Sequence, residues 1–175
     1  FGGTVHWLIN ILNIITGNMD SPGGAMFTTP AFDTLANPRT RGHYNKGQSR
    51  VRNIPEFAGE YPAVTMSDEM LVEGDGQIRA MVTSAGNPVL SVPGGEKLNQ
   101  AFAGLEFMVS IDYYINETTR YADLILPPAL NLHGGHFDII FNVLSVRNTV
   151  KYSKAVFPKE SGTKYDWEIF IELTE

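Results

Sequence analysis

The chain has 175 residues, and its 43% hydrophobic content is enough to fill the core of one ordinary domain. The formal net charge of −6 argues against a nucleic-acid surface, because phosphate binding depends on clusters of Lys and Arg that this sequence lacks. The absence of cysteine excludes disulfides, thiolate metal sites, iron–sulfur ligation and a cysteine nucleophile within the chain.

The N-terminal segment predicts a helix and then irregular structure. Apolar spacing from Val5 to Ile15 predicts a helix buried on most of its circumference, which Gly17 ends. The apolar run is too short to span a bilayer, which takes about 20 residues. From Asn18 to Pro62 we expect a long irregular loop, with a short helix near Phe32 to Leu35. Ser67 is expected to cap a short helix that reaches Leu71.

The middle of the chain alternates between apolar strands and helices. Strands that are apolar on both faces and alternate with helices predict a parallel sheet covered on both sides. The fold class is therefore α/β, a doubly wound parallel sheet with flanking helices. The expected strands are Ile78 to Ser84, Phe107 to Ile111 and Leu124 to Leu126, and the expected helices are Lys97 to Leu105 and Glu117 to Tyr121.

The C-terminal part is less regular. Weak alternation from Ile139 to Val150 predicts one or two strands, and Lys151 to Lys164 predicts a loop. A final packed helix is expected from the spacing of Trp167, Phe170 and Ile171. Core packing is the expected role of both tryptophans, Trp7 and Trp167.

Candidate binding residues follow the predicted strands, because ligands of open parallel sheets bind at the carboxyl ends of the strands. Gly86, Asn87 and Pro88 follow the first strand, Asp112 follows the second, and Pro127 and Pro128 follow the third. Asn and Asp can bind a ribose or a base edge, and a glycine lets the backbone approach a ligand closely. The alternatives are a left-handed or other turn conformation for Asn87 and a cap or turn role for Asp112.

Three other patterns admit two interpretations each. The sequence HGGHFD, with His133, His136 and Asp138, indicates either a metal site or a glycine turn. Asn116 and Thr118 form either a glycosylation sequon or the N-cap of a helix. The arginines of the long loop either bind an anion, or belong to a solvated loop or to an interdomain salt bridge; they are Arg39, Arg41, Arg50 and Arg52.

Three segments together resemble the molybdopterin oxidoreductases of the dimethyl sulfoxide reductase family, which includes formate dehydrogenases and nitrate reductases. They are LNIITGNMDSPGGAMF from Leu12 to Phe27, MVTSAGNPVLSVPGG from Met81 to Gly95, and LEFMVSIDYYINETTRYADLILPPAL from Leu105 to Leu130. Each motif is only moderately specific, but their order over about 120 residues is highly specific.

The resemblance implies a large multidomain parent enzyme. Its molybdenum or tungsten would be held by two molybdopterin guanine dinucleotides, with an iron–sulfur cluster possible in a missing N-terminal part. The partners implied are the remaining domains of the same polypeptide and an electron-transfer subunit. The expected division is residues 1–24 as the terminal helix of a neighbouring α/β domain, 25–130 as the nucleotide-binding domain, and 131–175 as connecting strands and a terminal helix.

The resemblance also assigns residue roles. Asn87, between Gly86 and Pro88, matches the Asn in the loop after the family's first strand, and Ile111 and Asp112 match a pair whose acidic member binds the guanosine. Pro128 stands at a further contact position where a polar residue is common, so only a backbone contact is carried over. HGGHFD departs from the family's turn, and no contact is transferred there.

The resulting hypothesis is a fragment that binds the guanosine diphosphate end of one molybdopterin cofactor. Its parent would catalyse a two-electron redox reaction on a small substrate such as formate or nitrate, and no residue of this chain is expected to be catalytic. The alternatives are a scaffold that kept the fold without the cofactor, and a free-standing domain for another nucleotide.

Overall fold

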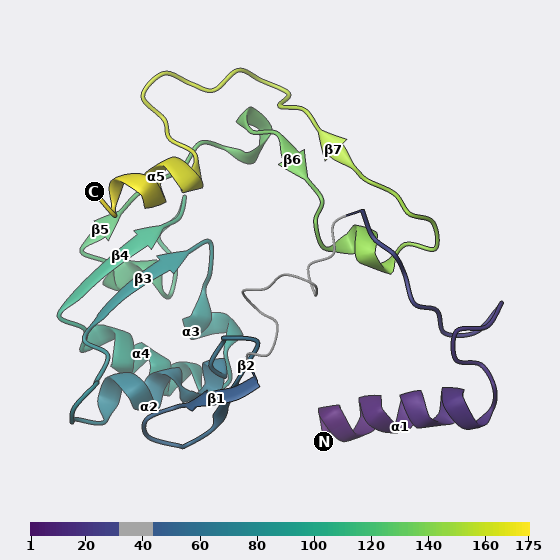
Figure 1. Ribbon diagram of the computed structural model, residues 1–175. Coiled ribbons are helices and arrows are strands. Elements are labelled where there is room, and N and C mark those ends of the chain that lie inside the picture. The colour runs from purple at the N-terminus through teal and green to yellow at the C-terminus, as the bar shows by residue number, and fades with distance from the viewer. Residues whose placement is uncertain (32–43) are drawn as a thin grey trace. The chain divides into compact units, whose positions relative to one another are not determined.

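The computed structural model describes residues 1–31 and 44–175 (Figure 1). The expected helix at 32–35, Arg39 and Arg41 lie outside the described residues. The described residues form two compact units, one made of 1–31 and 137–152 and the other of 44–136 and 153–175. The longer unit carries the predicted sheet.

The helices and strands follow the chain in a simple order. The α-helices are α1 (Gly2–Ile15), α2 (Met66–Leu71), α3 (Pro88–Ser91), α4 (Gly95–Ala103) and α5 (Asp166–Glu172). The strands are β1 (Tyr44–Gln48), β2 (Pro55–Phe57), β3 (Ala80–Ser84), β4 (Phe107–Ile111), β5 (Leu124–Ile125), β6 (His136–Phe137) and β7 (Tyr152–Ser153). Short 3-10 turns lie at Ala63–Thr65, Thr119–Tyr121, Asn131–His133 and Phe141–Leu144.

The central sheet is parallel, as the sequence predicts, with strand order β3-β4-β5. β3 and β4 pair residue by residue from Ala80 opposite Phe107 to Ser84 opposite Ile111. β4 is the middle strand, and four of its five residues are buried. This burial explains why the apolar run in the sequence predicts both ends of the strand correctly. The sheet is confirmed, with helices around it in a mixed α/β unit.

The hydrophobic core lies between the sheet and two helices. Met108 of β4 is fully buried against Leu98 and Phe102 of α4 and Met70 of α2. Figure 1 shows α2 and α4 together on this side of the sheet. Side chains of a strand alternate between faces, so Val109 points to the other side, where α5 supplies the buried Ile169.

The irregular loop expected from Asn18 to Pro62 contains a β-hairpin, so that prediction is wrong for its second half. β1 and β2 pair antiparallel, with Tyr44 opposite Phe57. The buried Glu56 carboxylate stabilises the hairpin, because it accepts hydrogen bonds from the backbone amides of Lys46 at 3.0 Å and Gly59 at 2.7 Å. A strand of mostly polar residues shows no apolar alternation, so periodicity could not reveal it.

Helix α1 forms and ends before Gly17, whose positive φ of 71° fits a helix terminator. Its predicted burial is wrong, because none of its residues is buried within the described chain. Trp7 has 61% of its surface exposed. Apolar side chains lie on all sides of the helix, and the described residues of its own unit bury none of them.

The C-terminal predictions are corrected in two places. The expected strands at Ile139 to Val150 are replaced by a 3-10 turn, and the short strands β6 and β7 lie just outside that range. Helix α5 is present, but Ile169 is its buried residue. Trp167, whose side chain is 59% exposed, and Phe170 and Ile171 remain outside the core, so the packing predicted for them is wrong.

Candidate functional site

The candidate residues after β3 and β4 lie at the same edge of the sheet. Because Ser84 pairs with Ile111 in a parallel ladder, both strands end at the same level. Asn87 comes three residues after Ser84, and Asp112 comes one residue after Ile111. The two polar side chains predicted from the sequence therefore belong to one rim.

The turn after β3 is held by backbone geometry. Ala85 adopts a left-handed conformation with φ of 51°, and its amide donates to the carbonyl of Ile111 at 3.0 Å. Asn87 has φ of −120°, so the left-handed alternative considered for it is wrong. A side-chain carbon added at Gly86 would meet no atom closer than 3.7 Å, which leaves this backbone open to a ligand. Non-glycine residues with positive φ carry strain and often occur at functional sites.

The side chain of Asn87 is held on both sides by the loop after β4. Its Nδ2 donates to Glu117 Oε2 at 2.6 Å, and its Oδ1 accepts the hydroxyl of Thr118 at 2.7 Å. The Asn87 amide, followed by a backbone amide, lowers the pKa of the exposed Glu117 carboxyl. The sequence analysis placed Glu117 at the start of an expected helix from Glu117 to Tyr121, and its bond to Asn87 was not predicted.

Asp112 is half-buried and bonded locally. Its Oδ1 accepts the backbone amide of Tyr113 at 2.6 Å, and its Oδ2 accepts the Asn116 amide at 3.4 Å. The turn role considered for Asp112 is thus present, and each carboxylate oxygen keeps a lone pair for another donor. Burial, with the negative charges of Asp166 and Asp112, raises the pKa of the Tyr113 phenol.

The remaining predicted contact residues are placed less favourably. Ile111 is 1% exposed and belongs to the core. Pro88 is the first residue of α3, a position that suits proline. Pro128 is buried, so its ring offers little surface to a ligand.

A hollow of about 500 Å³ opens next to this rim. Its lining residues are Ala129, Leu130, Asn131, Gly134, Gly135, His136, Tyr165, Asp166 and Trp167. The Tyr113 hydroxyl donates to the carbonyl of Ala129 at 2.8 Å, which ties the segment after β4 to the wall of the hollow. The rings of Tyr165 and Trp167 stack with centroids 6.1 Å apart. Sequence reasoning missed this hollow because its two walls are about 30 residues apart in the chain.

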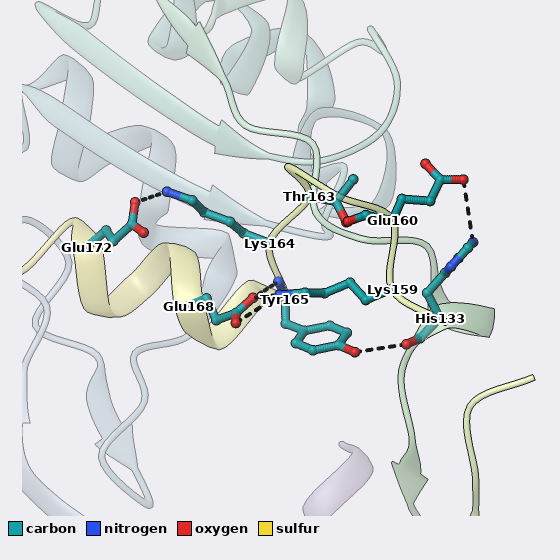
Figure 2. A network of polar contacts seen from close by, with 8 residues as sticks. All are labelled: His133, Lys159, Glu160, Thr163, Lys164, Tyr165, Glu168 and Glu172. Atoms are coloured by element: carbon teal, nitrogen blue, oxygen red, sulfur yellow. Dashed lines mark hydrogen bonds and ion pairs between the residues drawn. The ribbon is translucent and has the colours of Figure 1, made fainter. Parts of the chain in front are cut away.

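Polar contacts hold the two walls of the hollow together (Figure 2). Tyr165 donates its hydroxyl to the carbonyl of His133 at 2.9 Å, and the ammonium of Lys159 lies 4.6 Å from the centre of the Tyr165 ring. Lys159 also pairs with Glu168 at 2.7 Å. This bond and the Tyr165 amide lower the pKa of Glu168. The Tyr165 ring is therefore held at the start of α5, and the Trp167 ring stacks against it.

The described residues contain no group of three or more histidine, aspartate or glutamate side chains that could hold a metal ion. His133 is directed at the carbonyl of Pro158 and at Glu160, while His136 lines the hollow. The Asn116 side chain accepts the amides of Thr118 and Thr119, both at 2.9 Å, as an N-cap does.

The two described arginines of the loop form ion pairs within their own unit. Arg50 lies 3.4 Å from Glu69, and Arg52 lies 3.9 Å from Asp68. Lys97 also pairs with Asp68. These arginines therefore join the hairpin to α2 by ion pairs inside one unit, which neither the solvated-loop nor the interdomain interpretation predicted.

Comparison with known proteins shows the family. The family model described as molybdopterin oxidoreductase matches residues 1–175. The chain belongs to the molybdopterin oxidoreductase family. It is 28% identical to the assimilatory nitrate reductase catalytic subunit of Bacillus subtilis over 82% of this chain, and 26% identical to formate dehydrogenase H of Escherichia coli over 92%.

A further relative is the probable oxidoreductase YyaE of Bacillus subtilis, 25% identical over 99% of this chain. The chain spans 24% of the length of that relative, 19% of the nitrate reductase and 21% of the formate dehydrogenase. This family member is therefore matched to one part of much longer oxidoreductases. None of the helices in the described ranges has the length and apolar character of a membrane span.

Proposed function

We propose that this chain binds the guanosine diphosphate end of one molybdopterin guanine dinucleotide within a molybdenum or tungsten oxidoreductase. The observation that carries the proposal is the parallel pairing of β3 and β4, with Ser84 opposite Ile111, which sets Asn87 and Asp112 along one rim. Ligands of parallel α/β sheets bind at such strand ends. The doubly wound nucleotide-binding arrangement predicted from the sequence is part of the same proposal.

The chemistry of the neighbouring hollow supports a guanosine ligand. Guanine presents an N–H and an amino group on one edge, and a carboxylate such as Asp166 can accept both. The exposed ring of Trp167 offers a face on which a base can stack. Asp112 would accept ribose hydroxyls, and the open backbone at Gly86 would approach the diphosphate.

The cofactor would supply the redox chemistry, while the chain's own residues bind and orient its nucleotide end. Because the chain has no cysteine, a thiolate ligand of the metal would have to come from another part of the parent protein. Reduction of nitrate or oxidation of formate by the parent is proposed from the relatives named above. An iron–sulfur cluster and an electron-transfer subunit belong to the same proposal.

A scaffold without cofactor is the second candidate function. It is favoured by one observation, that Asn87 and Asp112 already form hydrogen bonds inside the chain. Metal analysis of the full-length protein, made in a host that synthesises the cofactor, separates the two candidates. Molybdenum or tungsten near one atom per molecule is expected, and absence of both metals would leave the scaffold.

The first prediction concerns nucleotide binding by full-length protein made without cofactor. Calorimetric titration is expected to show preference for guanosine diphosphate over adenosine diphosphate, and Asp112→Ala is expected to weaken binding about tenfold or more, because hydrogen bonds to charged groups contribute about 1.5–3 kcal/mol. The thermal midpoint of the empty variant should stay close to that of the wild type.

Asp123→Ala is the matched control. Asp123 accepts the backbone amide of Met108 at 2.8 Å and precedes β5, so it lies at the opposite edge of the sheet from Asp112. This variant should lose stability and keep its nucleotide affinity. Preference for adenosine diphosphate, or equal effects of the two substitutions on affinity, would contradict the proposed function.

A further inference from the structure

A continuous chain of hydrogen bonds joins the two proposed binding residues. The Asn116 side chain donates a hydrogen bond from Nδ2 to Asp112 Oδ2 at 3.4 Å, and its Oδ1 accepts one from the backbone amide of Thr118 at 2.9 Å. The Thr118 hydroxyl then donates to Asn87 at 2.7 Å. Asn87 in turn donates to Glu117 at 2.6 Å.

Thr118 is the central link of this chain. It is 0% exposed, and its hydroxyl also accepts the backbone amide of Val89 at 3.1 Å. Since Val89 belongs to α3, the single hydroxyl holds both the side chain of Asn87 and the helix that follows it. A buried hydroxyl with one acceptor and one donor partner has a fixed orientation.

These bonds also decide what Asn87 can offer a ligand. Thr118 occupies one lone pair of the Asn87 oxygen, and Glu117 occupies one of its two amide hydrogens. One N–H and one lone pair remain, and their directions are set by the loop after β4. Preset donors and acceptors bind a ligand at a smaller entropic cost than mobile ones.

We infer that Thr118 is a positioning residue, whose buried hydroxyl fixes the Asn87 amide group and links its orientation to that of Asp112 across the rim. The inference rests on the proposed guanosine site. It assigns to Thr118 a role in affinity that exceeds its role in folding. Thr118 itself is too deeply buried to contact the nucleotide.

The test uses full-length protein made without cofactor and titrated with guanosine diphosphate. Thr118→Val, which keeps the size and removes the hydroxyl, should lower the affinity of the folded protein about fivefold to tenfold, the loss of roughly one hydrogen bond. Thr118→Ser should restore the affinity to within about twofold. The double variant Asn87→Ala and Thr118→Val should bind no more weakly than Asn87→Ala alone, because both changes remove one interaction.

A merely structural role gives a different result. Thr118→Val would then lower the thermal midpoint, keep the wild-type affinity per folded molecule, and add its effect to that of Asn87→Ala; that result would overturn the inference. If Thr118→Val does not fold, Glu117→Ala provides the second variant, because Glu117 is exposed and holds the other side of Asn87. A loss of about threefold is expected with an unchanged thermal midpoint.

An unchanged affinity of Glu117→Ala would count against the inference in the same way. Two failures can be told apart. If the wild type does not bind guanosine diphosphate, the proposed function fails together with this inference. If the wild type binds and Asp112→Ala weakens binding, but Thr118→Val does not, only the positioning role fails.

Discussion

The two compact units differ in how much apolar surface they bury. The unit of residues 44–136 and 153–175 contains every buried apolar side chain among the described residues, including Leu98, Phe102 and Met108. In the unit of 1–31 and 137–152, no side chain with a described exposure is buried. Burial of apolar surface is the main favourable term in folding. The unit of residues 44–136 and 153–175 therefore has its own source of stability, which the described side chains of the other unit do not supply.

This difference explains where the site lies. A binding rim must be held in place by side chains that cannot move, and the core beneath β4 provides such support for Asp112 and Asn87. The exposed apolar surface of α1, in contrast, is typical of a surface that another part of a longer protein covers. We therefore expect α1 to gain stability only in the full-length protein.

The largest expected difference in stability between the two units comes from replacing one leucine in each. In the 175-residue chain, Leu98→Ala should destabilise the protein by about 2–5 kcal/mol, because Leu98 is 1% exposed in the core. Leu12→Ala in α1, where Leu12 is 58% exposed, should change stability by less than about 0.5 kcal/mol. Urea unfolding measures both, and equal losses would show that α1 packs as tightly as the core.

A smaller difference in stability is expected from replacing one hydrogen-bonded serine in each unit. Ser110 is fully buried and shares a hydrogen bond of 2.8 Å with Thr83 across the sheet, so Ser110→Ala should cost about 1 kcal/mol. Ser21 donates to the Gly17 carbonyl at 3.1 Å in the other unit, where water competes for the bond. Ser21→Ala should therefore leave the free energy of unfolding nearly unchanged, and a loss equal to that of Ser110→Ala would contradict the contrast.

The smallest effect concerns the attachment of α5. The folded-state pKa of Glu168 is lowered by Lys159 and by the Tyr165 amide, so its contribution to stability is present above the ordinary glutamate pKa of about 4.3. That contribution is lost as the pH falls through the lowered folded pKa. The thermal midpoint of Glu168→Gln should therefore lie slightly below that of the wild type near neutral pH, and the difference should vanish at low pH.

Glu172→Gln is the control for this last prediction. Glu172 pairs with Lys164 but, unlike Glu168, accepts no hydrogen bond from a backbone amide of the described residues, so its substitution should have the smaller effect. A difference between wild type and Glu168→Gln that persists unchanged in acid would show that the pair contributes nothing through its charge.

The sequence predicted the sheet better than its surroundings, for physical reasons. The limits of β4 are confirmed residue by residue, because a buried central strand is mostly apolar and only Ser110 interrupts the apolar run. The hairpin of β1 and β2 was missed, because its stability comes from contacts such as those of Glu56 rather than from an apolar pattern. The burial of α1 was predicted from the spacing of its apolar residues, but packing needs a partner that this spacing does not reveal.

The candidate site was predictable to a similar extent. Strand ends indicated Asn87 and Asp112, because the rule depends only on strand order and direction. The link through Thr118 and the hollow beside Asp166 were missed, because both depend on contacts between segments distant in sequence. Trp167 was assigned to the core, since its apolar spacing is the same whether a helix buries that face or presents it to a ligand.

The short ribbon of β6 and β7 has a consequence for how the chain tolerates change. Residues 137–152 begin in β6 and end in β7, and these two strands pair with each other. The segment is therefore a loop whose two ends are already held together. The entropic cost of closing such a loop rises only slowly with the length of the loop. Insertions at its tip should accumulate at little thermodynamic cost, whereas one between β3 and β4 would disrupt the crossover itself.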